Sequence, residues 1–297
     1  MKKIYWLIIV VAGILLLLGT FFDVQIAQLL YTLGSLFGQV FAVVAMIPIW
    51  FLVPMATGLM FGFLITNFKV LNALWRIICL ALLVFGIYMV LQRMGEMVGS
   101  RHLHGMPYNV LLWLVIGVFM LTTALGAHAS RRYPREVFVA AFVGIAAVAG
   151  SRFVLDQAKS LWGRQRFWTM DNPVLQFTPW YAPQFPSAER MAEMGDYIKS
   201  FPSGHSMGAI STLWLSLLPP FIRYCRKNLS RWVNGISIFA LCFWGCTILS
   251  RMMLGEHFLS DVAASGIVFL LFFAFFTFLA GKFHPAFNDE KSKHIAV

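Results

Sequence analysis

Long apolar runs separated by short polar connections fill most of the chain. Eight of these runs approach the length of about 20 residues that a membrane-spanning helix needs. They lie approximately at residues 5–22, 38–65, 70–91, 108–127, 137–155, 206–222, 233–249 and 259–280. The pattern predicts an all-α protein, a polytopic transmembrane helical bundle of about eight helices. Three spans fall in a predicted N-terminal part, residues 1–92, and the others in residues 93–297.

Two connections depart from this simple pattern. Residues 23–37 are apolar but too short for a span and contain Gly34, so we expect this stretch to lie along the membrane interface or to re-enter the bilayer. The longest polar connection, residues 167–201, has aromatic residues among prolines and is predicted to be a lid-like outer loop. Ser187 within it can cap a short helix. That helix would have one apolar face, formed by Met191, Met194 and Ile198.

The composition makes the class of protein clear. The chain is 60% hydrophobic and 12% charged, whereas soluble domains are about 25% charged. We therefore expect an integral membrane protein surrounded by a lipid bilayer. The net charge of +11 is not by itself a sign of a nucleic-acid partner, because in a membrane protein the position of each Lys and Arg matters more than the sum. No nucleic-acid partner is expected, and the pattern indicates no particular oligomeric state.

The positions of the charges predict the orientation. Most of the 23 Lys and Arg residues fall in or beside alternate connections, at residues 2–3, 69–76, 131–135, 223–231 and 282–293. Cytoplasmic connections are enriched in these residues, so both termini are predicted to be cytoplasmic and the first run is predicted to stay in the membrane. The other connections then face outward. The charge bias and the compact loops are compatible with a bacterial cytoplasmic (inner) membrane.

Candidate chemistry lies in three clusters at the outer ends of apolar runs, at residues 159–166, 202–205 and 250–261. In the third cluster His257 and Asp261 are four residues apart, so on a helix both side chains point the same way. A carboxylate that accepts the proton of one imidazole nitrogen fixes the tautomer and leaves the other nitrogen free to attack phosphorus. The spacing predicts His257 as a nucleophile that forms a phosphohistidine, with Asp261 orienting it.

The second cluster supplies an acid and a phosphate cradle. His205 follows Ser203 and Gly204 at the start of an apolar run, where unpaired helix amides attract anions. We expect His205 to protonate the leaving oxygen and then to activate water. The Ser203 hydroxyl and the Gly204 amide would hold phosphate oxygens.

The cations of the clusters complete the predicted pocket. Lys159, Arg166 and Arg251 would bind the phosphate and stabilise the charge of its transition state. Because fixed cations already occupy this role, no metal ion and no other cofactor is expected.

The three clusters together resemble the signature of the type 2 phosphatidic acid phosphatase (PAP2) family. Six residues separate Lys159 from Arg166, Pro-Ser-Gly precedes His205, and five and then three residues separate Arg251, His257 and Asp261. The resemblance covers residues 159–261. It implies a metal-independent phosphatase with a six-helix core, preceded here by two additional helices, and it gives the motif residues the roles described above. One departure is Phe167, which stands where the family usually has Pro.

These observations predict a membrane phosphatase that hydrolyses a lipid phosphate or diphosphate at the outer face. Undecaprenyl diphosphate, phosphatidylglycerophosphate and phosphatidic acid are substrates of the expected type, and a soluble sugar phosphate stays open. Two other functions fit the same residues, a lipid phosphotransferase and a non-enzymatic transporter of anions or lipids. Transporters usually place such groups near the bilayer midplane, whereas these lie at the ends of apolar runs, which favours catalysis.

Overall fold

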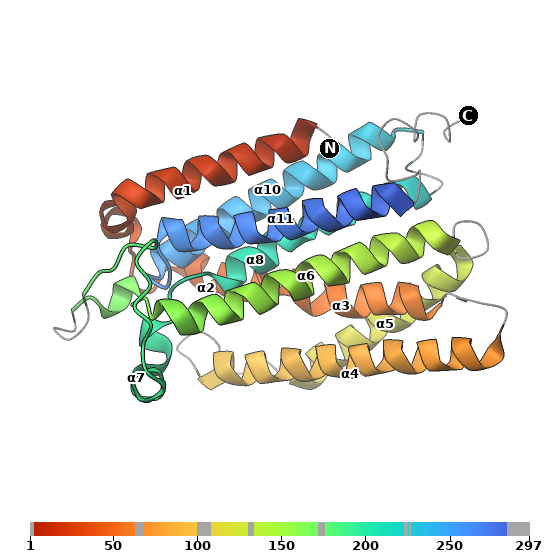
Figure 1. Cartoon of the computed structure of the whole chain (residues 1–297), viewed down its shortest axis with the longest axis horizontal. Coiled ribbons are helices and arrows are strands. Elements are labelled where there is room, and N and C mark those ends of the chain that lie inside the picture. The colour runs from red at the N-terminus through yellow and green to blue at the C-terminus, as the bar shows by residue number, and fades with distance from the viewer. Residues whose placement is uncertain are drawn as a thin grey trace. The chain divides into compact units, whose positions relative to one another are not determined.

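The computed structural model describes residues 3–62, 68–99, 108–129, 134–171, 176–222, 225 and 227–283. Within these ranges the regular elements are all helices (Figure 1). The α-helices are α1 (Lys3–Leu30), α2 (Leu36–Val44), α3 (Ile47–Phe61), α4 (Lys69–Gly99), α5 (Tyr108–Ala129), α6 (Pro134–Trp162), α7 (Ala188–Met194), α8 (Gly204–Ile210), α10 (Leu229–Met253) and α11 (Leu259–Phe283). Short 3₁₀-helices are η1 (Phe167–Thr169), η2 (Gly195–Ile198), η3 (Ser211–Leu217) and η4 (Pro219–Phe221). The predicted all-α fold is confirmed.

Six stretches of the described chain are long and apolar enough to cross a membrane. They are Ile4–Leu30, Leu36–Phe61, Lys69–Tyr88, Val137–Thr169, Leu229–Met253 and Leu259–Lys282. The chain is therefore an integral membrane protein with several spans, as its hydropathy predicts. The run at 108–127 lies on α5, a helix of 22 residues.

The run at 206–222 does not form one continuous α-helix. It begins as α8, which has 7 residues, and continues as η3 and η4. Pro219 and Pro220 lack the backbone N–H that a continuing helix requires, so they account for the break between η3 and η4. The α-helix has already ended at Ile210, before the prolines.

The stretch 23–37 is helical as far as Leu30. It is separated from the first part of α1 by a kink at Phe22 (φ −128°, ψ 16°). The chain leaves the helix after Leu30, and Gly34 adopts a positive φ of 80° in the turn toward α2. Asp23, just after the kink, is buried. That this stretch lies along the interface or re-enters the bilayer stays a prediction.

The helices form two compact units. The first consists of Met1–Met46, Ala147–Leu213 and Ile236–Ala274, and the second of Ile47–Ala146, Trp214–Gly235 and Phe275–Val297. Each unit is thus assembled from three separate stretches of the chain. All the residues to which the sequence assigned chemistry belong to the first unit.

Small residues and buried hydrogen bonds join the helices of the first unit. A Cβ atom on Gly150 of α6 would lie 2.7 Å from the ring of Phe272 of α11, so these helices approach closely. Trp244 of α10 donates its Nε1–H to Ser206 Oγ (2.7 Å), and that hydroxyl donates to the carbonyl of Val262 (2.6 Å). These two bonds link α10, α8 and α11 near the start of α8.

The second unit is packed in the same way. In it, Trp75 of α4 donates its Nε1–H to the carbonyl of Met60 in α3 (3.0 Å). A Cβ atom on Gly58 of α3 would overlap Thr122 of α5. Close helix contacts through small residues are typical of membrane bundles.

Candidate active site

The predicted site residues come from helix ends of the first unit. They are Lys159 in the last turn of α6, Arg166 after α6, Ser203, Gly204 and His205 at the start of α8, Arg251 in the last turn of α10, His257 between α10 and α11, and Asp261 in the first turn of α11. Contacts join the three sequence clusters. The N–H of Ser203 donates to the carbonyl of Asp261 (3.2 Å). Arg166 Nη1 donates to the carbonyl of Glu256 (3.4 Å), the residue before His257.

A tight turn between α10 and α11 positions His257. Gly255 adopts a φ of 68° after the end of α10, a left-handed conformation typical of the residue that terminates a helix. Its N–H donates to the carbonyl of Met252 (2.9 Å), and the N–H of Glu256 donates to the carbonyl of Arg251 (3.0 Å). The turn thus ties Glu256 and His257 directly to the end of the helix that bears Arg251.

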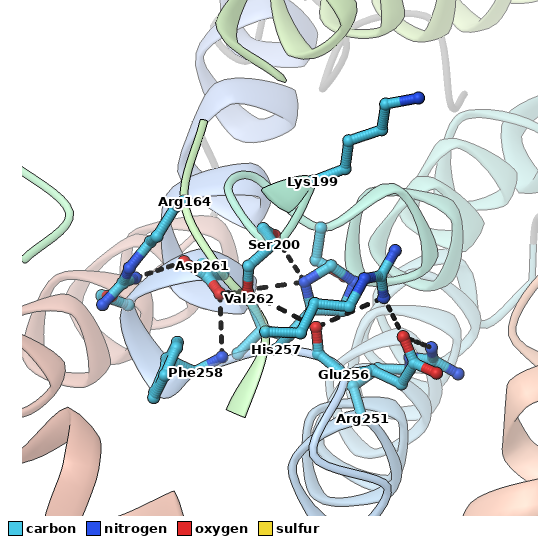
Figure 2. Close-up of polar contacts among 12 residues, drawn as sticks. Arg164, Lys199, Ser200, Arg251, Glu256, His257, Phe258, Asp261 and Val262 are labelled. Carbon is cyan, nitrogen blue, oxygen red and sulfur yellow. Dashed lines mark hydrogen bonds and ion pairs between the residues drawn. The ribbon is translucent and has the colours of Figure 1, made fainter. Parts of the chain in front are cut away.

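The hydrogen bond made by His257 determines which of its nitrogens can react. His257 is 2% exposed, and its Nδ1 lies 2.6 Å from the carbonyl oxygen of Ser200 (Figure 2). A carbonyl only accepts, so Nδ1 carries the proton and Nε2 carries the lone pair. Burial lowers the pKa of His257 to about 3, with Arg166 and Arg251 adding to the effect. The imidazole is therefore neutral at neutral pH.

Asp261 acts on His257 less directly than the sequence spacing predicts. Its Oδ2 lies 3.8 Å from His257 Nδ1, which is beyond hydrogen-bond range. The same oxygen accepts hydrogen bonds from Ser200 Oγ (2.5 Å) and from the N–H of Phe258 (2.8 Å). Asp261 therefore fixes the residue whose carbonyl holds the imidazole, and its charge lies close enough to favour a positive His257.

The start of α8 presents His205 beside these groups. Ser203 caps the helix by accepting a hydrogen bond from the N–H of Ser206 (3.3 Å), which leaves the hydroxyl hydrogen to donate. Among the described residues, His205 Nε2 has no hydrogen-bond partner although it is buried. Burial lowers the pKa of His205 well below its ordinary value, and the positive charge of Arg251 adds to this. A positive charge on this ring requires an anion nearby.

The three predicted phosphate-binding cations differ in how they are held. Lys159 Nζ donates to the carbonyl of Lys199 (3.3 Å). Arg166 donates from Nε to the carbonyl of Asp196 (2.7 Å) and from Nη2 to its carboxylate (2.9 Å). Arg251 is 3% exposed, and within the described chain its Nε and Nη1 are buried without a hydrogen-bond partner. Buried donors of this kind require an acceptor, and a phosphate would supply one.

Glu256 is an acid that the sequence reasoning missed. Its carboxylate pairs with Arg166 Nη1 and lies 3.6 Å from Arg251 Nη2. Two of the three cations are thus already partly neutralised by a protein carboxylate next to His257 (Figure 2). The sequence held a signal, because Glu256 immediately precedes the motif histidine in a chain that has only 12 acidic residues.

Arg164 is a second residue that the motif reading left without a role. Its side chain is fully buried and ion-pairs with Asp261 and with Asp23 of α1 (Nη2 to Oδ2, 2.8 Å). Its guanidinium also lies 4.4 Å from the ring centre of Phe258. Both contacts rigidify the first turn of α11, where Asp261 lies.

The connection 167–201 belongs to the first unit. Ser187 caps α7 by accepting from the N–H of Arg190 (3.2 Å), so the predicted short helix is confirmed. It ends at Met194, so Ile198, which was predicted on its apolar face, lies instead in η2. Phe201 stacks on Trp162 with ring centres 4.9 Å apart.

The last residues of the connection reach the candidate site, since Asp196, Lys199 and Ser200 supply the acceptors described above.

In the described part of the chain, no group of three or more His, Cys, Asp or Glu side chains is arranged to hold a metal ion. The side chains around His205 are predominantly cations, a donor set that suits an anion rather than a divalent metal.

Comparison with known proteins gives one match. A sequence profile described as the PAP2 superfamily matches residues 139–284, which include all three clusters. Neither a curated protein nor a solved structure matches the chain.

Proposed function

The chain belongs to the PAP2 superfamily through residues 139–284, and from this premise we propose that it is a membrane phosphatase that hydrolyses a lipid phosphate or diphosphate through a phosphohistidine. Phosphatase-type activity is what membership of this superfamily implies. The observation that carries the finer proposal is the state of His257. It is a neutral, buried imidazole whose Nδ1–H is held by the Ser200 carbonyl, so its Nε2 lone pair is available for attack.

The first half of the reaction transfers the phosphoryl group to the protein. The lone pair of His257 Nε2 forms a bond to phosphorus while the bond from phosphorus to the leaving oxygen breaks. His205 donates a proton to that oxygen. Positive charge develops on His257, and the Asp261 carboxylate at 3.8 Å stabilises it.

The second half releases phosphate. His205, now neutral, takes a proton from a water molecule as the water oxygen attacks phosphorus. The bond from phosphorus to Nε2 breaks, and its electrons return to His257. Burial, and after it the neighbouring cations, lower the pKa of His205. A negative substrate would offset the cations and favour the protonated form that the first half requires.

The cations hold the phosphate and its five-coordinate transition state. Arg251 offers two buried donors, Nε and Nη1, that have no partner among the described residues. Lys159 and Arg166 add fixed positive charge, and the Ser203 hydroxyl and the Gly204 amide hold further oxygens in this proposal. Preorganised donors of this kind supply a large share of phosphoryl-transfer catalysis.

A lipid is the substrate class that the surroundings favour. Lys159, Arg251 and Asp261 lie in the terminal turns of long apolar helices, so a phosphate can reach the site while its hydrocarbon tail stays in the bilayer. The distribution of Lys and Arg places these ends on the outer, periplasmic side of a bacterial cytoplasmic membrane in this proposal. Labelling Ser187→Cys in intact cells with a membrane-impermeant reagent, in a background without the four native cysteines, would test that side.

The experiment that tests the function is phosphate release by the detergent-purified protein in the presence of excess chelator. The substrates are an undecaprenyl diphosphate, phosphatidylglycerophosphate, phosphatidic acid and a soluble sugar phosphate. We expect release from at least one lipid, lost by at least about a thousand-fold in His257→Ala and retained in Asp171→Asn, which changes an exposed carboxylate.

The outcomes separate the competing functions. Release that needs a second lipid as acceptor would indicate a phosphotransferase using the same site. If neither the wild type nor His257→Ala released phosphate from any substrate, hydrolysis would be contradicted and anion transport favoured.

A further inference from the structure

Asp23 lies in α1, more than a hundred residues before the segment that matches the superfamily and outside all three sequence clusters. Building on the proposed phosphatase function, we propose that Asp23 is a positioning residue of the catalytic site. It acts through Arg164 on Asp261 and Ser200, which hold the nucleophile His257. The N-terminal helix is on this account a working part of the active site.

The burial of Asp23 is the first observation. Asp23 is 4% exposed and is the one charged residue that the sequence has from Ile4 to Leu30. A buried carboxylate is strongly unfavourable unless hydrogen bonds and an opposite charge compensate it. Its presence in an apolar helix therefore indicates a specific set of partners.

The first partner is Arg164. Asp23 Oδ2 lies 2.8 Å from Arg164 Nη2, while Arg164 Nη1 pairs with Asp261. The exposed fractions of the three side chains are 3%, 0% and 0%. One guanidinium thus binds two carboxylates, one from α1 and one from the first turn of α11. Because all three groups are buried, water screens their electrostatic attraction only weakly.

The second partner is the start of α11. Asp23 Oδ1 accepts a hydrogen bond from the N–H of Ser260 (2.9 Å), and Oδ2 accepts one from the Ser260 hydroxyl. The residue before α11 is Phe258, which has no side-chain acceptor to cap the helix. Asp23 therefore serves as a cap supplied by another helix, a position where negative charge is favourable.

The close approach of the two helices requires a glycine. A Cβ atom on Gly19, one turn before Asp23, would lie 2.5 Å from the backbone nitrogen of Ser260 and 2.9 Å from Asp23 Oδ1. Space for the carboxylate at the start of α11 thus depends on a residue without a side chain.

The contacts continue to the nucleophile. Asp261 accepts from Ser200 Oγ (2.5 Å), and the Ser200 carbonyl holds His257 Nδ1 at 2.6 Å. Without the negative charge of Asp23, Arg164 would draw Asp261 toward itself and away from Ser200. The imidazole would then lose its alignment, whereas the cations that bind phosphate lie outside this chain of contacts. Misplacement should therefore lower kcat more than it raises KM.

The test compares Asp23→Asn with the exposed control Asp171→Asn in the full-length, detergent-purified protein. We expect kcat to fall by about 10- to 100-fold with KM within about twofold. Vanadate, which adopts the five-coordinate geometry and bonds to the nucleophile, should bind more weakly by a similar factor. Inorganic phosphate, which forms no bond to the nucleophile, should bind nearly as tightly as to the wild type. A residue that only stabilised the fold would not separate these two ligands.

Two further variants keep the proposal testable. When Arg164 is already replaced by Gln, adding Asp23→Asn should lower kcat little further, because substitutions within one network do not have additive effects. If Asp23→Asn does not fold, Ser260→Ala removes the hydrogen bond from its hydroxyl to Asp23 and the one that it accepts from Arg164 Nη1, and leaves every charge in place. It should still weaken the binding of vanadate more than that of phosphate.

The outcomes are distinct. Unchanged kcat and unchanged vanadate binding in folded Asp23→Asn would overturn this inference and leave the phosphatase proposal standing, as would equal losses of vanadate and phosphate binding. A wild type that binds vanadate without turning over any tested substrate still allows the inference to be read from binding. A wild type that neither releases phosphate nor binds vanadate would overturn both.

Discussion

Glu256 places a negative charge inside a pocket suited to phosphate. Its carboxylate pairs with Arg166 and lies 3.6 Å from Arg251, so two of the three cations face a protein anion before any substrate arrives. A phosphate that enters must share these cations with Glu256. The resident carboxylate therefore weakens the binding of every anion, including the product, and a phosphatase that holds its product too tightly turns over slowly.

Replacing this charge should strengthen product binding. In Glu256→Gln the side chain keeps its shape, while the two arginines lose their carboxylate partner. We expect the inhibition constant of inorganic phosphate to fall by about threefold or more, because charge-assisted hydrogen bonds become available to the ligand. Inhibition of phosphate release by added phosphate measures this.

Glu189→Gln is the matched control for that substitution. Glu189 lies on the exposed face of α7, so its replacement changes the net charge of the chain equally without touching the pocket. An inhibition constant that stays constant or rises in Glu256→Gln would contradict the role of Glu256 as a competing anion.

At the scale of single residues, the sequence indicates which side chains carry the chemistry but not which backbone groups position them. His205, Arg251 and His257 stand out because their side chains are rare at the ends of apolar runs. The carbonyl that orients His257 belongs to Ser200, and every residue has a carbonyl, so no residue type marks it. Asp23 was noticed only as the start of an irregular stretch, because its partner Arg164 is 141 residues away.

Among the elements, the turn between α10 and α11 has the strictest requirement. Gly255 holds a φ of 68°, and a Cβ atom there would lie 2.8 Å from the ring of Tyr31 and 3.1 Å from Trp168 Cβ. The conformation and the packing both exclude larger residues. The spacing between Arg251 and His257 thus depends on one glycine.

Gly255→Ala should therefore damage both stability and activity. A left-handed conformation costs an L-residue about 1–2 kcal/mol, and the contact with Tyr31 adds to this. We expect a lower thermal unfolding midpoint and a reduced kcat, since the turn carries His257. Thermal unfolding in detergent and phosphate-release kinetics measure the two effects.

Gly245→Ala in the preceding helix is the control. Gly245 lies in the interior of α10, where a Cβ atom would meet nothing within 4 Å, and Ala favours a helix. The role assigned to the turn would be wrong if both variants unfolded at the same temperature as the wild type.

Hydropathy predicts the long helices well, because a span needs a long apolar run and such runs are easy to recognise. It fails where a local feature interrupts the run. The stretch 206–222 changes from α-helix to 3₁₀-helix after Ile210, and α1 continues past a kink at Phe22 to Leu30. Only the break before Pro219 has a signal in the sequence, because proline cannot donate the hydrogen bond that a continuing helix requires.

For the whole molecule, the buried neutral histidines make stability depend on pH. The pKa of His257 falls to about 3 in the folded protein, and that of His205 falls well below its ordinary value, in both cases chiefly because of burial. In the unfolded chain both would titrate near 6.5. Below that pH the unfolded state binds more protons, so the contribution of each histidine is complete above about pH 6.5 and is lost in acid. For His257 the loss continues as the pH falls toward about 3.

We therefore expect the thermal unfolding midpoint to decrease as the pH is lowered from about 6.5. His257→Asn removes one of the two groups and should decrease less steeply with acid than the wild type. Unfolding scans across this pH range measure the slopes.

His128→Asn controls for the loss of a histidine as such, because His128 is exposed on α5. Parallel slopes for the wild type and His257→Asn would contradict the assignment of a neutral, buried His257.

The class of molecule was the most predictable property of all. Composition and hydropathy indicate a helical membrane protein, and the spacing of three clusters indicates its superfamily. The assembly of the first unit from three separate stretches could not be predicted, because hydropathy reports each helix by itself and says nothing about which helices meet.

The pairing of Asp23 with Arg164 also has a consequence for the order of synthesis. The ribosome makes α1 before α6, and 141 residues separate Asp23 from Arg164. A carboxylate within an apolar helix is costly in a bilayer until it is paired. Until α6 and the following Arg164 have been translated, Asp23 must therefore stay near water or be shielded by another protein. Efficient insertion of this chain thus depends on a helix pairing that forms late in translation.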